Sequence, residues 1–404
     1  MKIAIIAHGR FHAFDLVPEL LKRGHDVTLF TNYPRWAVAR FGVPLHCVRT
    51  FPVHGVVSRA VGRLRDKTGW SFDAWIHPWF SRWAARQLRR ESWDVVHAWT
   101  GVAEEIYSEP SLRTSCKMVM RGSAHIQTQA EILAAEEVRV RRRIDQPSKW
   151  MILREQREYD LADKIMVLSS FAFDSFRERG VPESRLRLLP LGSEVGAFRP
   201  AADVIQARKA RIASGAPIRV LYVGGVCYRK GLLDLREIVG KESTRFDFRF
   251  IGPVWPEAES IVSALRGQAE FVGKIPHKKL APEYAWGDVF IFPTIEDGYA
   301  AVLAQASAAA LPILTTANCA GPDLVREGRT GWVLPIRNPQ AFIERLNWCD
   351  SHRGELAEMV TAAWSEFRTR NWFDVAVDFE ELCTSTIGER VGLTRHSLPP
   401  KLER

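Results

Sequence analysis

Short, continuously apolar runs alternate with longer segments of helical period along most of the chain. A run without polar alternation is typical of a strand that is covered on both faces of a parallel sheet. The helical segments between these runs include Phe14–Lys22, Trp150–Leu161, Leu232–Val239 and Ala300–Ala310. The predicted strands form two series, which are Ile3–Ala7, Val27–Thr31, Val95–Trp99, Met118–Met120 and Ile165–Leu168, and then Val220–Val223, Phe248–Ile251, Val289–Phe292, Ile313–Thr315 and Trp332–Leu334.

Two sets of alternating strands and helices predict an α/β protein with two Rossmann-like, doubly wound domains. A chain of 404 residues is too long for one ordinary hydrophobic core and suits two domains. The strand-like segment Leu186–Leu191 is followed by a polar stretch before the second series begins. We therefore expect domains over 1–191 and 218–367, a linker over 192–217, a terminal helix over 368–388 and a frayed tail over 389–404.

The composition is that of a soluble globular protein, with 46% hydrophobic and 25% charged residues. A net charge of +9 favours an anionic partner, either a nucleotide, a phosphorylated substrate or an anionic membrane surface. No Lys- and Arg-rich run of the nucleic-acid-binding type occurs, so we expect no nucleic-acid partner.

The six cysteines form no Cys-x-x-Cys pair, which argues against a zinc site and favours a reducing cytoplasm. No apolar stretch reaches the length of about 20 residues that a membrane-spanning helix needs.

The first candidate for chemistry is a glycine-rich loop with a basic pair. Gly224 and Gly225 follow a predicted strand, and Arg229 and Lys230 precede a predicted helix. Glycines allow backbone N–H groups to approach an anion, and a helix N-terminus adds partial positive charge. The loop therefore predicts a phosphate site. The alternative is a tight turn with a solvated basic pair.

The second candidate is an acidic loop that precedes a helix of small and apolar residues. Asp297 and Gly298 stand at the mouth of this helix, and Gln305 lies two turns into it. Because the helix must be buried, the amide of Gln305 needs hydrogen-bond partners. One sugar ligand could contact both Asp297 and Gln305, since hydroxyls both donate and accept. The alternative is an Asp that caps the helix and a Gln that bonds to the backbone of the core.

The order and spacing of these pieces resemble family 4 retaining glycosyltransferases of the GT-B architecture. The resemblance implies two Rossmann-like domains that face each other across a cleft and a last helix that packs back on the first domain. It covers most of the chain and is strongest from about 150 to 340. The segments that carry it are Lys22–Val27, Glu158–Ile165, Leu168–Ser170, Ser175–Phe176, Gly224–Gly231, Gly252, Phe271–Gly273, Gly287–Thr294, Asp297–Ala306, Leu311–Ile313, Glu327–Trp332 and Asn371–Phe373.

The resemblance implies donor-binding roles for the C-terminal half. Gly224, Gly225, Arg229 and Lys230 would hold the donor diphosphate. Asp297, taken as catalytic, would contact the donor sugar, and Gln305 would bond to the ribose hydroxyls. The backbone of Gly298, Tyr299, Ala300 and Ala301 would face the sugar and phosphate. The usual pair in this family is Glu and Glu, so Asp297 and Gln305 are departures that leave the donor sugar and its base open.

The resemblance also implies roles in the N-terminal half. His125 would lie at the active-site cleft as a catalytic residue, since it follows a strand at the edge where such sheets bind ligands. Arg121 would contact an acceptor anion, and Gly9 and Arg10 would line the acceptor side. A lone histidine is more often a structural residue with satisfied hydrogen bonds, and that interpretation stays open for His125.

The sequence contains no Asp-x-Asp, so we expect no metal and no cofactor. Cationic side chains and a helix dipole would stabilise the leaving nucleoside diphosphate instead. The resemblance implies front-face displacement, in which the leaving phosphate accepts the acceptor's proton. Two alternatives stay open: a non-catalytic homologue that acts as a partner subunit, and a sugar-nucleotide epimerase of the same architecture.

A basic stretch over residues 59–90 contains aromatic residues at helical spacing. Tryptophan with arginine favours a membrane headgroup interface, and anionic lipid attracts such clusters. We therefore predict a lipid-linked or glycan acceptor and peripheral contact with the inner face of the plasma membrane. The alternative is a core-facing helix with a solvated basic face, which Pro78 would begin or kink. The residues are Phe72, Trp75, Ile76, Trp79, Phe80 and Trp83, with Arg59, Arg63, Arg65, Lys67, Arg82, Arg86, Arg89 and Arg90.

Overall fold

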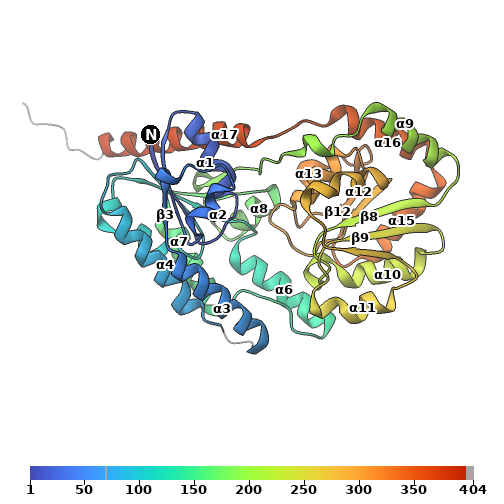
Figure 1. The fold of residues 1–404 in the computed structure, drawn as a ribbon, viewed down its shortest axis with the longest axis horizontal. Helices are drawn as coiled ribbons and strands as arrows, with labels where there is room; N and C mark the ends of the chain where they lie inside the picture. The colour runs from blue at the N-terminus through green and yellow to red at the C-terminus, as the bar shows by residue number, and fades with distance from the viewer. Residues whose placement is uncertain (69–70, 397–404) are drawn as a thin grey trace, which may run out of the picture.

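Two parallel sheets flanked by helices form the two halves of the molecule (Figure 1). The computed structural model describes residues 1–68 and 71–396. The strand orders are β3-β2-β1-β4-β5-β6-β7 and β10-β9-β8-β11-β12-β13, and adjacent strands pair in parallel. The strands are β1 (Lys2–Ala7), β2 (Asp26–Thr31), β3 (Val48–Thr50), β4 (Val95–Trp99), β5 (Cys116–Met120), β6 (Lys164–Val167), β7 (Leu186–Leu188), β8 (Ile218–Val223), β9 (Phe246–Ile251), β10 (Glu270–Gly273), β11 (Val289–Phe292), β12 (Ile313–Thr316) and β13 (Gly331–Leu334).

Helices connect successive strands in both halves, as the hydrophobic pattern predicts. They are α1 (Ala13–Lys22), α2 (Arg35–Ala39), α3 (Pro52–Thr68), α4 (Asp73–Leu88), α5 (Glu104–Tyr107), α6 (Ile126–Val140), α7 (Lys149–Leu161), α8 (Ser170–Glu178), α9 (Ala202–Ala213), α10 (Leu232–Glu242), α11 (Glu259–Ala264), α12 (Leu280–Trp286), α13 (Ala301–Ala308), α14 (Gly321–Leu324), α15 (Pro339–Ser351), α16 (Arg353–Glu366) and α17 (Trp372–His396).

The structure confirms the predicted fold class, and every predicted strand is present. The pattern did not identify β3 and β10 as strands. Both lie at an edge of their sheet, and their side chains are only partly buried. An edge strand has one neighbour and one exposed flank, so it does not need a continuous apolar run. The edge strand β13 was predicted because its side chains are mostly buried, in contrast to those of β3 and β10.

Each sheet has a point where the strand order reverses, at β1 between β2 and β4 and at β8 between β9 and β11. In open α/β sheets, ligands bind outside the carboxyl ends of the strands at such a point. The loops that follow β5 and β11 meet between the two halves. A Cβ atom added to Gly298 would lie 1.9 Å from the carbonyl oxygen of Gly122. The fold therefore brings the loops of the two sheets into direct contact.

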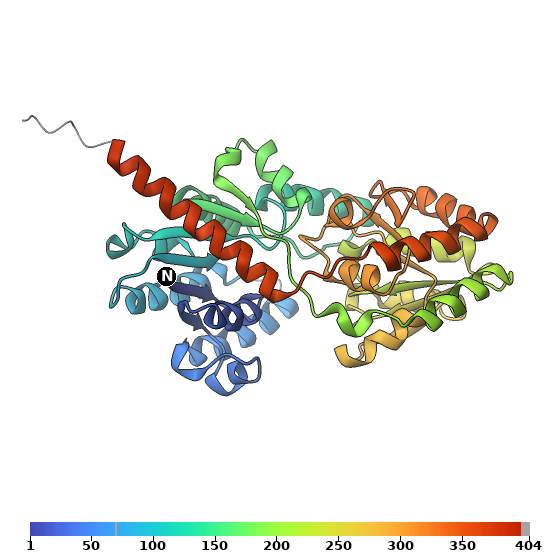
Figure 2. The same cartoon turned by 90° about the horizontal axis from the view of Figure 1, so that it is seen from above.

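The chain crosses between the halves twice, and the two crossings touch. A Cβ atom on Gly192 would lie 2.6 Å from the carbonyl oxygen of Asn371. Helix α17 then runs back over the N-terminal half, where it packs on α1 and β5 (Figures 1 and 2). The helix continues past the predicted end at residue 388. Glu389 pairs with Lys164, and Arg390 pairs with Asp163, so residues 389–396 are not a frayed tail. Residues 397–404 lie outside the described part of the chain.

Helix α4 does not present its aromatic residues on one common exposed face. Ile76 and Phe80 are buried in the core, whereas Trp75 is 54% exposed. Trp79 and Trp83 are partly buried. Pro78 lies inside the helix and does not begin it. The exposed side forms an aromatic groove of about 280 Å³, lined by Phe51, Ala74, Trp75, Trp79, Arg82, Trp83 and Arg86. The side chains of Arg65 and Lys67 lie outside those that the structure describes.

Candidate active site in the interdomain cleft

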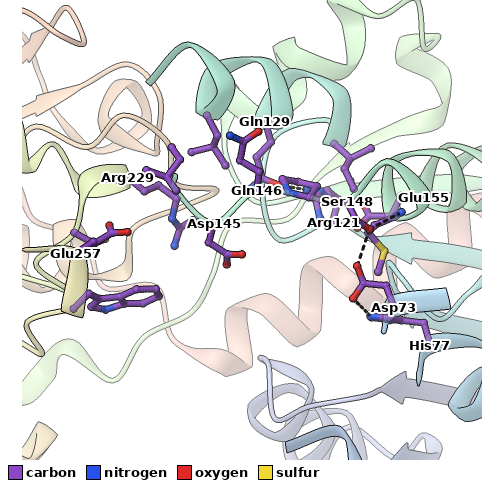
Figure 3. A pocket seen from close by; sticks show the side chains of 17 residues that line it. Asp73, His77, Arg121, Gln129, Asp145, Gln146, Ser148, Glu155, Arg229 and Glu257 are labelled. Carbon is purple, nitrogen blue, oxygen red and sulfur yellow. Dashed lines mark hydrogen bonds and ion pairs between the residues drawn. The ribbon is translucent and has the colours of Figure 1, made fainter. Parts of the chain in front are cut away.

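A cavity of about 350 Å³ lies between the two halves of the molecule. Arg229 and Trp255 line its C-terminal side, and Asp73 and His77 of α4 line its N-terminal side (Figure 3). Its volume falls in the range of small-molecule binding sites. Both halves contribute walls, so the site exists only when the two domains are close together.

The basic pair Arg229–Lys230 lies on a 3₁₀ turn, η5 (Tyr228–Lys230), directly after the glycine loop. Gly231 ends this turn at φ 80°, and a Cβ atom there would lie 2.0 Å from the carbonyl oxygen of Pro293. Glycine is therefore required for the turn to lie against the loop after β11. Lys230 is buried and pairs with Asp297, whereas Arg229 is 40% exposed and lines the cavity. Arg229 is thus the cation of this pair that faces the cavity.

Asp297 holds the loop that leads into α13 (Ala301–Ala308). Its Oδ1 accepts hydrogen bonds from the backbone N–H groups of Tyr299, at 3.1 Å, and Ala300, at 2.9 Å. Burial raises the pKa of the Asp297 carboxyl, but the nearby charge of Lys230 outweighs it, so the pKa falls below its ordinary value. The carboxylate is therefore ionised. Asp297 is not the N-cap of the helix, which is Ala300, and the N–H groups of Tyr299 and Ala300, expected to face a ligand, are engaged by its carboxylate.

Gln305 is not the deeply buried amide that the apolar helix predicted. Its Oε1 accepts a hydrogen bond from the Tyr284 hydroxyl at 2.8 Å, and its Nε2 lies 3.3 Å from Nε2 of His277. The side chain is partly exposed. Its two partners come from α12 and from the turn that precedes α12. Neither Gln305 nor Asp297 lines the cavity that contains Arg229.

Of the predicted donor residues with described side chains, Arg229 is the one that lines this cavity. Gly225 packs against Trp255, which lines the cavity: a Cβ atom on Gly225 would lie 3.1 Å from Nε1 of Trp255. Gly224 bonds through its N–H to the carbonyl oxygen of Ile251. Gly298, Tyr299, Ala300 and Ala301 lie at the interdomain contact or at the start of α13, outside the cavity lining.

The structure does not place His125 in the cavity. Its backbone N–H donates to the Ser175 hydroxyl, and its Nδ1 accepts a hydrogen bond from the backbone N–H of Gln127, which caps α6. The ring packs against Tyr159 and Phe176. Burial and the charges of nearby arginines lower the pKa of His125 to about 4, so the ring is neutral at physiological pH. The structural interpretation accounts for all of these contacts. The neighbouring Ile126 lines the cavity, and a catalytic role for His125 stays a prediction.

Gly9 and Arg10 also lie outside the cavity lining. The Arg10 guanidinium contacts Asp15 at 3.4 Å and lies over the ring of Phe41. Asp15 lies in the first turn of α1 and Phe41 follows α2, so Arg10 joins these two segments, and its acceptor role stays a prediction.

Arg121 lies in the cavity, but its guanidinium is already engaged. Its Nη1 donates to Glu155 at 3.0 Å, its Nη2 to Gln129 at 2.6 Å, and its Nε to the carbonyl oxygen of Ala124. Its charge is therefore compensated within the N-terminal half. This arrangement gives little support to the predicted contact with an acceptor anion.

Sequence reasoning missed Glu296, whose fully buried carboxylate connects the two halves. The hydroxyl of Ser123 donates to its Oε1. Gln129 Nε2 donates to Oε2 at 3.0 Å, and the Arg229 guanidinium lies 3.3 Å from the same oxygen. The sequence signal nearest to it is the pair of consecutive acids that follows a buried strand, but that local pattern does not show which carboxylate is buried, because burial depends on donors from the other half.

Comparison with known proteins identifies the family. The model for Glycosyltransferase Family 4 matches residues 10–195, and the model for Glycosyl transferases group 1 matches residues 217–349. The chain belongs to glycosyltransferase family 4. The two matches cover the two halves that surround the cavity, so the family assignment and the position of the cavity agree.

Two curated relatives and one solved structure are similar to this family 4 chain. It is 25% identical over 232 residues to the GDP-mannose-dependent alpha-mannosyltransferase of Corynebacterium glutamicum, which is 57% of this chain and 52% of the relative. It is 22% identical to the putative colanic acid biosynthesis glycosyltransferase WcaL of Salmonella typhimurium, over 47% of this chain and 48% of the relative. The chain thus spans about half the length of these curated relatives. Anabaena HepE in complex with UDP has the same fold, with a TM-score of 0.67, 12% identity, and coverage of 95% of this chain and 100% of that one.

The buried carboxylate of Glu296 should hold this family 4 chain in its closed form. Glu296→Ala leaves the donors of Ser123 and Gln129 without their acceptor, which costs about 1–3 kcal/mol of unfolding free energy. We expect a larger radius of gyration in small-angle X-ray scattering and a lower midpoint of denaturation. The control is Glu237→Ala, which removes a carboxylate that pairs with Lys241 on the exposed face of α10. Unchanged scattering and unchanged stability in Glu296→Ala would contradict this role.

Proposed function

We propose that this chain is a retaining hexosyltransferase that uses a nucleoside-diphosphate sugar. The acceptor is a glycan or a lipid-linked sugar, and the reaction serves the synthesis of cell-surface polysaccharide, lipopolysaccharide or glycolipid on the cytoplasmic side of the membrane. The observation that carries the proposal is the family match on both sides of one cavity, with Arg229 exposed at its C-terminal end. The mannosyltransferase of Corynebacterium, the colanic acid glycosyltransferase of Salmonella and the UDP bound to HepE support the class of donor and of pathway.

The charges around the basic pair suggest how the donor is held. Arg229 and Lys230 would take the diphosphate, and Lys230 would exchange its contact with Asp297 for a phosphate oxygen. The released carboxylate and the N–H groups that it caps would then face the donor sugar. Cations at this position stabilise the leaving nucleoside diphosphate as its negative charge develops. In the front-face path, the leaving phosphate accepts the acceptor's proton, so no base from the enzyme is required.

The first test is nucleotide binding by the basic pair. Each charge-assisted contact contributes about 1.5–3 kcal/mol, so Arg229→Ala/Lys230→Ala should weaken nucleotide binding at least about a hundredfold. Calorimetric titration with UDP, GDP and ADP gives the affinities, and assays with the matching sugar nucleotides give hydrolysis and transfer. Arg236→Ala/Arg266→Ala, which removes two charges from the exposed surface of the same half, is the control. Equal affinity in the wild type and the double variant would exclude this site. Binding without turnover would instead indicate a partner subunit.

We also propose that catalysis needs no divalent metal. The support is the absence of Asp-x-Asp from the sequence together with the cationic pair at the donor end. Turnover should therefore be unchanged after dialysis against EDTA, and added magnesium or manganese should not raise it. The measurement is the initial rate of transfer or donor hydrolysis in metal-free buffer. Activity that EDTA abolishes and magnesium restores would overturn the proposal.

We propose peripheral membrane binding through the surface formed by α3 and α4. No helix in the described part of the chain is both long and apolar enough to cross a bilayer. The aromatic groove contains Trp75 and Arg82, while Val53 and Val56 of α3 are more than half exposed. Tryptophan and arginine together suit a headgroup layer, and exposed valines add apolar area that can enter it.

Membrane binding should depend on these aromatic and basic residues. The wild type should sediment with phosphatidylglycerol-containing vesicles at low salt and be released at high salt, because salt screens the attraction. Arg82→Gln/Arg86→Gln and Trp75→Ser should each reduce the bound fraction severalfold. Arg236→Gln/Arg266→Gln removes the same charge from the other half and should leave binding unchanged. Wild-type protein that stays in the supernatant at low salt would show that this surface does not bind anionic lipid.

A further inference from the structure

The N-terminal end of the cavity carries polar groups that the donor site does not use. Asp73 and His77 project from α4 toward Ser148 at the start of α7 (Figure 3). The Ser148 hydroxyl donates to Asp73 Oδ2 at 2.7 Å, and His77 Nε2 lies 4.0 Å from Asp73 Oδ1. Both side chains are mostly buried, with 20% and 15% of their surface exposed. The group is therefore held in place and still borders the cavity.

This end of the cavity is poorly suited to an anionic ligand. Arg121 is the arginine that lines its N-terminal part, and Glu155 and Gln129 already hold its guanidinium. Carboxylates line both sides, including Asp73 and Glu155 in one half and Glu257 in the other. A phosphate or uronate brought to Asp73 would face a carboxylate, and Arg121, the arginine among the described residues that line this end, already pairs with Glu155.

A neutral sugar fits these groups. An ionised carboxylate accepts several hydrogen bonds, and the hydroxyl of Ser148 occupies only one oxygen of Asp73. The second oxygen, Oδ1, faces His77 Nε2 at 4.0 Å on the cavity wall, so one sugar hydroxyl can bridge these two atoms while a neighbouring hydroxyl contacts the carboxylate. Arg229 at the opposite end keeps the donor diphosphate away from this position (Figure 3).

We propose that Asp73 and His77 bind the hydroxyls of a neutral sugar at the acceptor end and select against an acidic sugar there. This inference rests on the proposed function, since an acceptor site requires a transfer reaction. It assigns these two residues to acceptor specificity, and it places any anionic portion of the acceptor outside the cavity.

The test uses methyl α-mannoside and methyl α-glucoside as neutral acceptors and methyl glucuronide as an acidic one, with the sugar nucleotide that the wild type binds. Asp73→Asn keeps the shape and the Ser148 contact but removes the charge. It should raise the KM for the neutral acceptor about tenfold and reduce the preference over the glucuronide, because a charge-assisted hydrogen bond is lost. The KM for the donor and the rate of donor hydrolysis without acceptor should stay within about twofold. His77→Gln should also raise the acceptor KM, and the exposed Asp174→Asn on α8 is the matched control.

Melting temperatures of all variants separate a folding defect from a change in specificity. Failure of the wild type to bind any nucleotide would count against the proposed function itself. If the wild type hydrolyses the donor but uses the glucuronide better, or transfers to none of the three glycosides, the acceptor inference is wrong. It is also wrong if folded Asp73→Asn and His77→Gln keep the wild-type acceptor KM.

Discussion

The buried carboxylate of Glu296 is the interaction that links the contact between the two halves to the donor end of the cavity. A charge removed from water is tolerated only when hydrogen bonds and an opposite charge replace the lost hydration. Here the compensation comes from both halves, through Ser123 and Gln129 on one side and Arg229 on the other. Opening the cleft would separate this carboxylate from two of its donors. The closure of the domains and the charge at the donor end are therefore coupled through one residue.

Close backbone contact makes this coupling geometrically possible. Gly122 and Gly298 approach so closely that neither loop leaves room for a side chain at Gly298. The Ser169 hydroxyl also donates to the carbonyl oxygen of Gly298 at 2.7 Å, across the same boundary. These contacts come from loops at the carboxyl ends of two parallel sheets, which is where this class of fold places its ligands. Tight packing there shapes a cavity whose walls belong to both domains.

The charges in the interdomain cavity differ from those on the surface beside the aromatic groove. The chain has a net charge of +9, yet the cavity is lined by carboxylates as well as arginines. Exposed arginines of α4 lie beside the aromatic groove, on the opposite side of the helix from the cavity residue Asp73. One helix thus borders both the cavity and the surface proposed to contact lipid. The net positive charge of the chain describes the surface proposed to contact lipid, but it does not describe the cavity, which also contains carboxylates.

The hydrophobic pattern by itself determined the two sheets, because buried parallel strands need continuous apolar runs that are visible in sequence. The spacing of the glycine loop and the acidic helix determined the family, and it identified Arg229 as a residue of the cavity. Only the tertiary structure decided which polar groups share that cavity. It showed that a ring nitrogen of His125 caps α6, and it revealed Glu296 and Asp73, whose partners are distant in sequence. Local patterns report burial and turns, whereas a site between two domains depends on long-range contacts that no local pattern contains.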